Sequence, residues 1–426
     1  MTPGRRLLNI LGGSAGNLVE WFDWFTYASF AIYFSPAFFP TGTPTSQLLG
    51  AALVFAGGFI ARPLGALLLG IYADRAGRRA ALTLSVSMMC GGSLLIALIP
   101  TGLGALSTLL LVGARLLQGI SVGGEYGASA TYVSEMASRE RRGFWSGCLY
   151  VTLIGGQLAA MLLQVLLQRL LSEQQLYDWG WRVPFVVGAA LAVIVFWIRR
   201  GIHETDSFTR ASAADHAGRA ERGRVGVLLT RYARETGIVL VLTAGGGVGF
   251  YTYTTYMQKM LVNTAGLDKA VASQIMTAVL ATFIFFPPLV GWLSDRVGRK
   301  PTMIASFVCG ALLAVPCLTA LSQVREPSTA YLLLLPPLFA LAGYCSLSAI
   351  MKADLYPAQV RALGMSVPYA IAMAIFGGNA EAAALWFKQI GQERTWYWIV
   401  AAIFACGALV ATFMRDPQRH SRVDRD

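Results

Sequence analysis

The chain has 426 residues, of which 55% are hydrophobic and only 13% are charged, and its formal net charge is +12. An average soluble domain carries about 25% charged residues, and a soluble chain of this length would divide into two or three domains that each need a polar surface. This composition excludes an ordinary soluble protein and favours the lipid bilayer as the solvent.

Twelve apolar stretches that are long enough to cross a bilayer core of about 30 Å recur along the chain. The stretches are continuous and do not alternate in the manner of barrel strands, so they predict helices. In chain order they lie near residues 9–36, 47–73, 80–100, 105–134, 143–170, 182–200, 236–262, 270–293, 301–322, 328–353, 362–388 and 395–415.

The lysines and arginines are distributed unevenly between the two sets of connections. If both termini are cytoplasmic, 24 of the 34 lie in cytoplasmic segments and six lie in outward connections. This bias is the one that the positive-inside rule describes. The net positive charge therefore belongs to the cytoplasmic face of a membrane protein, and we expect no nucleic-acid partner.

Two motifs repeat at nearly the same offset. "GIYADRAGRR" (70–79) follows the second span and "GWLSDRVGRK" (291–300) follows the eighth, with Asp74 and Asp295 221 positions apart. Glu135 and Asp354, each followed by an arginine seven residues later, are 219 apart. This indicates a duplicated six-helix unit.

The duplication leads to a prediction for the whole fold. We expect an all-α polytopic membrane protein with 12 transmembrane helices in two pseudo-symmetric six-helix bundles. The bundles would cover residues 1–200 and 236–415, with a cytoplasmic linker at 201–235 and a cytoplasmic tail at 416–426.

The first repeated motif predicts a gate on the cytoplasmic side. Its aspartate can accept hydrogen bonds from helix N-termini or arginines of the other half, and such contacts would break when that side opens. The alternative is that the basic residues only set the orientation. The proposed gating residues are Gly70, Asp74, Arg75, Gly77, Arg78, Arg79, Asp295, Arg296, Gly298 and Arg299.

Four cations lie inside the spans: Arg62, Arg115, Lys259 and Lys352. A charge at the bilayer centre costs at least about 2.5–3.5 kcal/mol, so such residues normally face the protein interior or a wet cavity. The two arginines lie close to mid-depth. The two lysines lie nearer span ends, where a flexible side chain can reach the interface, and for Lys352 beside Asp354 this interpretation is at least as good as a functional one.

Polar residues at helical spacing predict a shared aqueous cavity between the halves. In the seventh span, Thr252, Thr255, Tyr256 and Lys259 fall at i, i+3, i+4 and i+7. A guanidinium binds a carboxylate bidentately, so a dicarboxylate would suit Arg62 or Arg115 facing Lys259 across the interface. The candidate substrate-binding residues are Arg62, Arg115, Gln157, Tyr27, Tyr256 and Lys259. Permanent pairing of the cations with buried acids stays open as the alternative.

Driving an anion into a negative interior requires a cotransported charge. All three histidines lie in cytoplasmic segments, so the cotransported proton must bind to a buried carboxylate. The candidates are Glu20, Asp23 and Glu125, while Glu381 is left open as either functional or structural. The sequence contains no P-loop, zinc signature or catalytic triad, so we expect no cofactor, no metal site and no enzymatic activity.

The motif G-x-x-x-D-R-x-G-R-R, repeated in the second half, resembles the major facilitator superfamily. Within it, "GNLVEWFDWFTY" (16–27), "RLLQGISVGGEYG" (115–127) and "YPAQVRALG" (356–364) resemble the metabolite–proton symporter family. One departure is Trp24, where relatives commonly have Phe, and it would affect pocket shape at most.

The resemblance covers essentially the whole chain and implies a function. It implies a monomer of the bacterial inner membrane that imports an organic anion with protons by alternating access. A dicarboxylate such as α-ketoglutarate is the first substrate hypothesis. Citrate, shikimate or an osmolyte carried by the same fold is the second, and a non-transporting membrane sensor is the third.

Overall fold

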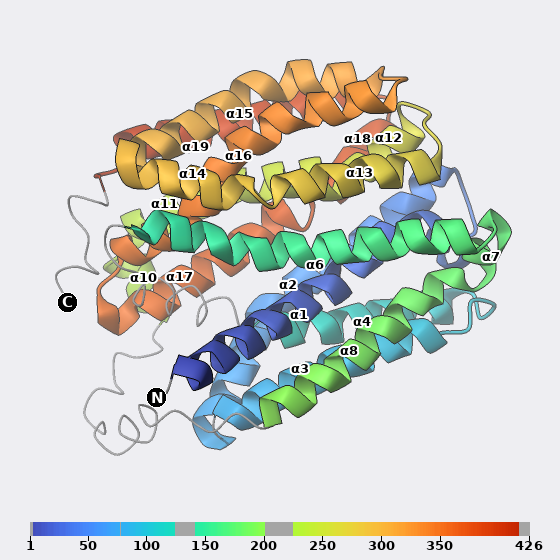
Figure 1. Ribbon diagram of the computed structural model, residues 1–426, viewed down its shortest axis with the longest axis horizontal. Coiled ribbons are helices and arrows are strands. Elements are labelled where there is room, and N and C mark those ends of the chain that lie inside the picture. The colour runs from blue at the N-terminus through green and yellow to red at the C-terminus, as the bar shows by residue number, and fades with distance from the viewer. Residues whose placement is uncertain (1–2, 77, 124–140, 201–224, 417–426) are drawn as a thin grey trace.

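The computed structural model describes residues 3–76, 78–123, 141–200 and 225–416, and within these ranges the chain is helical with short connections. The elements in chain order are α1 (Pro3–Phe38), α2 (Pro44–Ala76), α3 (Arg78–Leu98), α4 (Ala105–Val122), α6 (Arg142–Leu170), α7 (Glu173–Asp178), η2 (Gly180–Arg182), α8 (Val183–Arg200), α10 (Val225–Thr230), α11 (Ala233–Phe250), η4 (Tyr251–Tyr256), α12 (Met257–Asn263), α13 (Lys269–Phe283), α14 (Phe286–Val297), α15 (Arg299–Ser322), α16 (Pro327–Leu355), α17 (Ala358–Ala372), η5 (Met373–Gly377), α18 (Ala380–Gln389) and α19 (Glu393–Phe413). Figure 1 shows them running side by side.

These elements form the twelve predicted spans. Ten segments of the described chain are long and apolar enough to cross a membrane by length and composition. Helix α1, with 36 residues, and helix α3, with 21, complete the set. The seventh span consists of α11, η4 and α12, the eighth of α13 and α14, and the eleventh of α17, η5 and α18. The predicted all-α fold class is confirmed.

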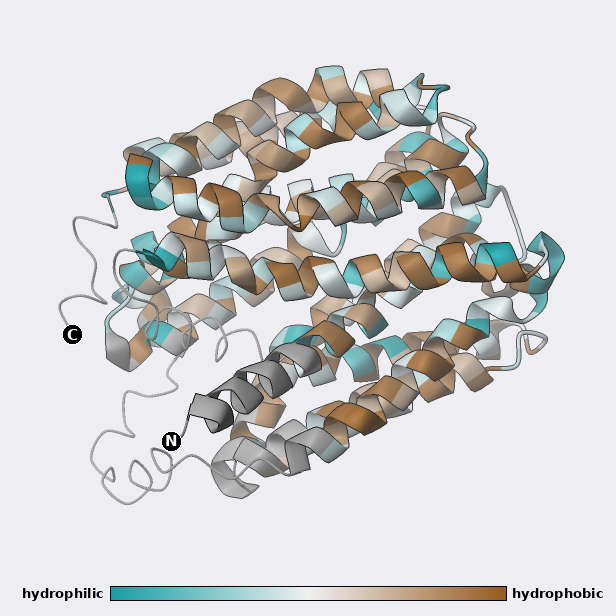
Figure 2. Cartoon of the chain, in the orientation of Figure 1, coloured by the Kyte–Doolittle hydropathy of each residue, from teal (hydrophilic) through white to brown (hydrophobic). Residues whose placement is uncertain are grey.

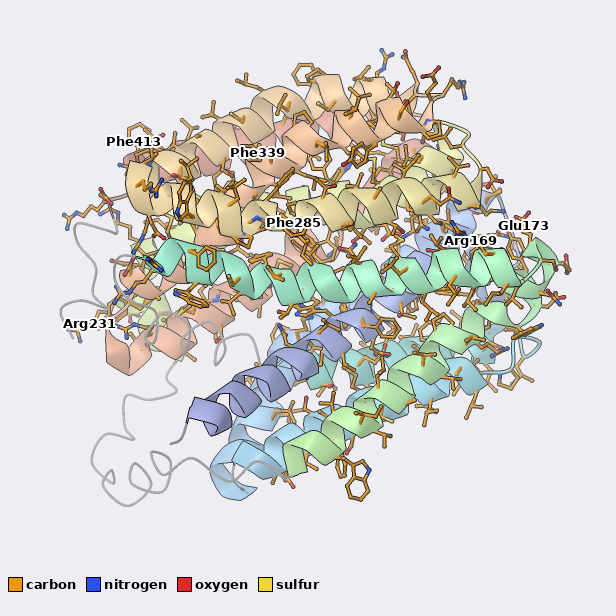
Figure 3. The ribbon with its side chains drawn as sticks, in the orientation of Figure 1. Arg169, Glu173, Arg231, Phe285, Phe339 and Phe413 are labelled. Atoms are coloured by element: carbon orange, nitrogen blue, oxygen red, sulfur yellow. The ribbon has the colours of Figure 1, made fainter. Side chains whose placement is uncertain are left out.

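Polar and apolar residues separate along the helix axes, as a membrane protein requires. Figure 2 shows hydrophilic residues gathered toward the helix ends and apolar residues along their lengths. In Figure 3, Arg169 and Glu173 lie at one end of the molecule and Arg231 at the other. Phe285 and Phe339 lie between these ends and are 71% and 45% exposed, as lipid-facing side chains would be.

The two bundles meet along α6, which packs against α1 of its own half and against α13, α14 and α16 of the other half (Figure 1). Small residues allow the close approach. A Cβ on Gly143 of α6 would lie 2.5 Å from the Gly291 carbonyl oxygen of α14, and one on Gly147 would lie 2.4 Å from the Pro287 oxygen. Such contacts between small residues let membrane helices pack backbone to backbone. Helix α2 packs on α18 at a second contact between the halves.

Two short π-helical segments interrupt the second bundle. They are η4 in the seventh span and η5 in the eleventh, and π-helical turns occur frequently at functional sites. The Tyr251 ring of η4 lies 5.2 Å from the Phe59 ring of α2, and a Cβ on Gly377 of η5 would lie 3.5 Å from Tyr251. Helix α2 of the first bundle also contacts η5, so both irregular segments face the interface between the bundles.

The predicted linker and tail lie mostly outside the described residues. Of the segment 201–235, the structure describes only the last part, in which α10 forms and α11 begins at Ala233. The predicted domain boundaries stay predictions.

Candidate functional site

The indole of Trp24 on α1 contacts both mid-depth guanidinium groups. The Cζ atom of Arg62, on α2, lies 4.1 Å from the centre of the indole, and that of Arg115, on α4, lies 4.2 Å from it. Arg62 also lies 4.1 Å from the Phe59 ring, and Arg115 lies 4.4 Å from the Tyr27 ring. Cation–π contacts of this kind stabilise a guanidinium in a site that is largely shielded from water. The structure thus gathers two cations around one aromatic side chain.

Both guanidinium groups present the same edge without a hydrogen-bond partner among the described residues. Arg62 is 5% exposed and Arg115 is fully buried. In each residue, Nε and Nη2 are buried and have no hydrogen-bond partner among the described residues. Unsatisfied buried donors are uncommon and costly. Nε and Nη2 form the side-on edge of the guanidinium, which binds a carboxylate through two parallel hydrogen bonds.

Asp23 lies one turn before Tyr27 on α1 and is linked to Arg115 through a glutamine. Gln118 Nε2 donates to Asp23 Oδ2 at 2.6 Å, and Gln118 Oε1 accepts from Arg115 Nη1 at 2.8 Å. Ser93 on α3 donates to Asp23 Oδ1 and accepts from Gln118 Nε2 at 2.9 Å. The result is a buried hydrogen-bonded chain that joins three helices of the first bundle.

Among the described residues, a small cavity lies next to these groups. It has a volume of about 20 Å³, which is about the space of one water molecule. It lies between the bundles and is lined by residues of α1, α6, α11, η4, α16, α17 and η5, including Trp21, Tyr150, Tyr251, Tyr344 and Tyr369. An organic acid needs far more room than this cavity offers, so the described residues pack closely around the site in this conformation.

Lys259 is paired in this conformation, contrary to the expectation that it faces Arg62 or Arg115 as an available cation. Its ammonium lies 3.1 Å from Glu381 Oε1 of α18 and donates to the Ala28 carbonyl oxygen of α1 at 2.6 Å. The lysine therefore joins the two bundles directly. Glu381, whose role was left open, is the counterion of Lys259.

The polar residues predicted to share one face of the seventh span do not all point toward the same neighbours. Tyr256 donates to Glu393 Oε1 at 3.0 Å, at the start of α19, so its hydroxyl is engaged within the second bundle. The physical reason is η4, because a π-helical turn breaks the 3.6-residue spacing that places i, i+3, i+4 and i+7 on one face. Sequence periodicity alone does not reveal such a turn.

The other predicted site residues lie near the interface or cannot be placed. The Tyr27 hydroxyl donates to the Ala51 carbonyl oxygen at 3.1 Å, so its ring rather than its hydroxyl faces Arg115. Gln157 on α6 donates to the Thr254 oxygen at 3.2 Å across the interface. Glu20 is 3% exposed and interacts electrostatically with Arg62. Glu125 lies outside the described residues.

Lys352, whose role was left open, is buried against two aromatic rings. Its ammonium lies 4.4 Å from the centre of the Tyr369 ring and 5.7 Å from that of Tyr344, and the residue is 3% exposed. Asp354 lies 3.0 Å from Arg299 Nη1.

The second copy of the gating motif contacts the other bundle. Asp295 accepts the backbone N–H groups of Gly143 and Phe144 at the start of α6. Gly298 has φ of 107°, a conformation that favours glycine, and begins α15. Arg296 lies over the Trp292 ring at 3.7 Å, and Arg299 pairs with Asp354. In the first copy, Gly77 lies outside the described residues, and the surroundings of Gly70 and the side chains of Asp74, Arg75, Arg78 and Arg79 are not described either.

Two residues of the site were not predicted from the sequence. Ser93 lies in an apolar stretch with nothing to distinguish it from other serines in spans. Trp24 was expected to affect only pocket shape, but it contacts both arginines. A signal existed for Gln118, which lies one turn after Arg115.

Comparisons with known proteins give a consistent picture. The sequence model of the family described as Major Facilitator Superfamily matches residues 15–351 and 239–425. "Alpha-ketoglutarate permease" of Escherichia coli (strain K12) is 48% identical over 412 residues, covering 96% of this chain and 94% of that protein. "Citrate-proton symporter" of Klebsiella pneumoniae is 31% identical over 421 residues, covering 96% and 92%. The solved structure of the proton:xylose symporter XylE bound to 6-bromo-6-deoxy-D-glucose superposes with a TM-score of 0.75 at 18% identity, covering 97% and 98%, and this likeness concerns the fold.

Proposed function

The chain belongs to the major facilitator superfamily, and we propose that it is a proton-coupled symporter that imports a dicarboxylate such as α-ketoglutarate by alternating access. The relatives named for α-ketoglutarate and for citrate with protons support this function, and both are transporters rather than enzymes. Parallel six-helix repeats of this kind bind cargo at their interface near the membrane midplane and rock around it.

One observation carries the choice of an anion with two carboxylates. Arg62 and Arg115 lie on the same indole, and each presents a buried Nε–Nη2 edge that has no partner within the described part of the chain. Each edge matches one carboxylate, so a dicarboxylate would satisfy both. We place Arg62 and Arg115 in direct contact with the substrate. Tyr27 and Gln157 would line the site, while Lys259 and Tyr256 would reach it only after their present contacts break.

Proton coupling would use a carboxylate next to the arginines. Glu20 and Asp23 are both buried on α1, and Asp23 is hydrogen-bonded toward Arg115 through Gln118. Each proton brought in offsets one negative charge of the substrate against the membrane potential, which is worth about 2.3 kcal/mol per charge per 100 mV. Glu125 stays a candidate on sequence grounds.

Alternating access would use the contacts between bundles at both ends. On the side that we assign to the cytoplasm, Asp295 caps α6 of the opposite bundle. Toward the other side, Lys259 joins Glu381 to Ala28. Opening either side requires its contact to break, so the two contacts oppose each other in setting the direction of opening.

The remaining features of the proposal concern location. We propose a monomer in the bacterial inner membrane with both termini in the cytoplasm. The supporting observation is the distribution of arginines and lysines, most of which lie in connections on one side.

The test is uptake into proteoliposomes that contain the purified protein, with an imposed inward proton gradient and a panel of labelled acids. We expect α-ketoglutarate to accumulate above its external concentration, and a protonophore to abolish the accumulation. If citrate is taken up instead, the dicarboxylate assignment is replaced by the citrate alternative that the second relative favours. Uptake of only a zwitterionic osmolyte would overturn the anion assignment.

A further inference from the structure

Gln118 lies between Asp23 and Arg115, where it can link the binding of a proton to the binding of an anion. Its amide bridges an obligate acceptor and an obligate donor: Asp23 Oδ2 at 2.6 Å and Arg115 Nη1 at 2.8 Å. An ionised carboxylate only accepts and a guanidinium only donates. With Asp23 ionised, only one amide orientation satisfies both neighbours, with the nitrogen toward Asp23 and the oxygen toward Arg115.

We propose that the side-chain amide of Gln118 is a positioning switch that links proton binding at Asp23 to the availability of Arg115 for substrate. This inference rests on the symport proposed above and names the residue that couples its two cargoes. A proton taken from the external solution onto Asp23 Oδ2 converts that oxygen from an acceptor into a donor. The amide then turns its oxygen toward Asp23, and Arg115 Nη1 loses its partner.

The consequence for Arg115 is a change in both hydrogen bonding and charge. Before the proton arrives, Nη1 is held by Gln118 while Nε and Nη2 are unsatisfied. After the proton arrives, three donors are unsatisfied and the negative charge of Asp23 is neutralised. An incoming carboxylate is then the best available partner. Proton binding therefore precedes tight anion binding, which is the order that symport needs.

The helices pack closely around Gln118 and Asp23. A Cβ on Gly92 of α3 would lie 2.6 Å from Gln118 Cγ, and one on Gly188 of α8 would lie 2.6 Å from Asp23 Oδ1. Only glycine at these two positions lets α3 and α8 approach Gln118 and Asp23 this closely. An amide can exchange its oxygen and nitrogen by turning about its last torsion, without moving its neighbours.

The charged and titratable groups that interact with Asp23 are Arg115 on α4 and Cys90 on α3, and α8 packs on Asp23 through Gly188. Arg115 in turn interacts with Tyr27 on α1, Arg62 on α2 and Tyr251 of η4, and Arg62 interacts with Glu20 on α1. Of the described residues, Ser93 and Gln118 are the ones that hydrogen-bond to the Asp23 carboxylate. Ser93 donates to the other oxygen, Oδ1, so a proton on Oδ2 acts on Gln118.

The test compares the pH dependence of substrate binding in the full-length protein, wild type against Gln118→Met. One linked proton changes the apparent Kd by about tenfold per pH unit. For the wild type we expect the Kd for α-ketoglutarate to rise at least about tenfold between pH 6 and pH 8. For Gln118→Met, which keeps the length but loses the amide, we expect less than about a threefold change. Counterflow exchange would persist in this variant, while accumulation driven by a proton gradient would be lost.

Ser121→Ala is the matched control, because Ser121 lies one turn from Gln118 on α4 and donates to the Ser85 oxygen of α3 at 2.8 Å. It removes a buried hydrogen bond between the same helices and should keep the wild-type pH dependence. If the Kd of Gln118→Met depends on pH as steeply as that of the wild type, the switch is overturned. Loss of the slope in Asp23→Asn but not in Gln118→Met would mean that Asp23 acts on Arg115 directly.

A second variant and a substrate-independent measurement complete the test. In Gln118→Glu, the neutral acid reproduces both hydrogen bonds, whereas the ionised form pairs with Arg115. We expect near-wild-type transport at pH 6 and at least a tenfold loss relative to wild type at pH 8; equal transport at both pH values contradicts the switch.

Infrared difference spectra of the empty protein should show a side-chain amide band that shifts as Asp23 protonates and is absent in Gln118→Met. If α-ketoglutarate never binds but this band is present, the proposed function fails and the switch stands.

Discussion

Asp295, near the end of α14 in the second bundle, accepts the backbone N–H of Gly143 at 2.8 Å, at the start of α6 in the first bundle. Its other carboxylate oxygen accepts the N–H of Phe144 at 3.0 Å. A carboxylate is favourable there because the first N–H groups of a helix lack partners and carry a partial positive charge. The cap crosses the interface, so it stabilises only conformations in which this side is closed.

Asp295→Ala is therefore expected to favour opening on that side. Loss of a helix cap costs about 1 kcal/mol, which is roughly a fivefold change in the closed-to-open ratio. The readout is the alkylation rate of Ser294→Cys in a background without the native cysteines, because Ser294 is fully buried against Gly143. We expect alkylation to become several times faster.

The control for this prediction removes a cap that does not cross the interface. Asp268 accepts the Ala270 N–H at 2.7 Å at the start of α13, within the second bundle. Asp268→Ala should leave the alkylation of Ser294→Cys unchanged. An unchanged rate in Asp295→Ala as well would remove the gating role of this aspartate.

Arg62→Gln and Arg115→Gln are each expected to abolish uptake. Truncating one partner of a buried charge pair costs about 2–5 kcal/mol, so the affinity for substrate should fall at least about 30-fold. Arg62→Lys and Arg115→Lys keep the positive charge but lose the two parallel N–H donors, and they should retain only a small part of the activity. Arg169→Gln, at an exposed position, is the control for purification and insertion. Normal uptake by both glutamine variants would place the substrate elsewhere.

Trp24 is expected to position both guanidinium groups through its ring. Two cation–π contacts at about 0.5–1 kcal/mol or more each are lost in Trp24→Leu, so we expect KM to rise about tenfold. Trp24→Phe keeps an aromatic face and should raise KM less than about threefold. The comparison of initial uptake rates over a substrate series measures both. If leucine and phenylalanine behave alike, the ring acts only by filling space.

Lys259 and Glu381 are expected to behave as a coupled pair in a stability measurement. Removing one partner of a buried ion pair costs about 3–5 kcal/mol, because it leaves a buried charge without its counterion. Lys259→Met and Glu381→Leu should each therefore destabilise the protein strongly, and the combination of the two should recover most of the loss. Thermal unfolding in detergent for the four members of the cycle gives the coupling energy.

The same double variant tests whether Lys259 binds substrate. If uptake at saturating substrate survives without the lysine, Lys259 serves only as the contact to Ala28 and Glu381. If the stable double variant no longer takes up α-ketoglutarate, the lysine belongs to the substrate site in an open conformation, as its position in the sequence suggested.

Some features of this protein follow from the sequence by itself. The twelve spans, the repeated gating motif and the burial of Arg62 and Arg115 were all predicted, because bilayer thickness, positive-inside bias and the cost of a buried charge act on local sequence. The prediction that the repeated aspartate meets a helix N-terminus was also confirmed for Asp295.

Only the tertiary structure decided which groups meet. Lys259 pairs with Glu381 and reaches Ala28, which is 231 positions away, and no periodicity encodes such a partner. Tyr256 leaves the predicted face because a π-helical turn shifts the register. Trp24 and Gln118 link the arginines to each other and to Asp23 because four helices converge there. A helical pattern gives the face that a side chain occupies, whereas its partner depends on how distant helices cross.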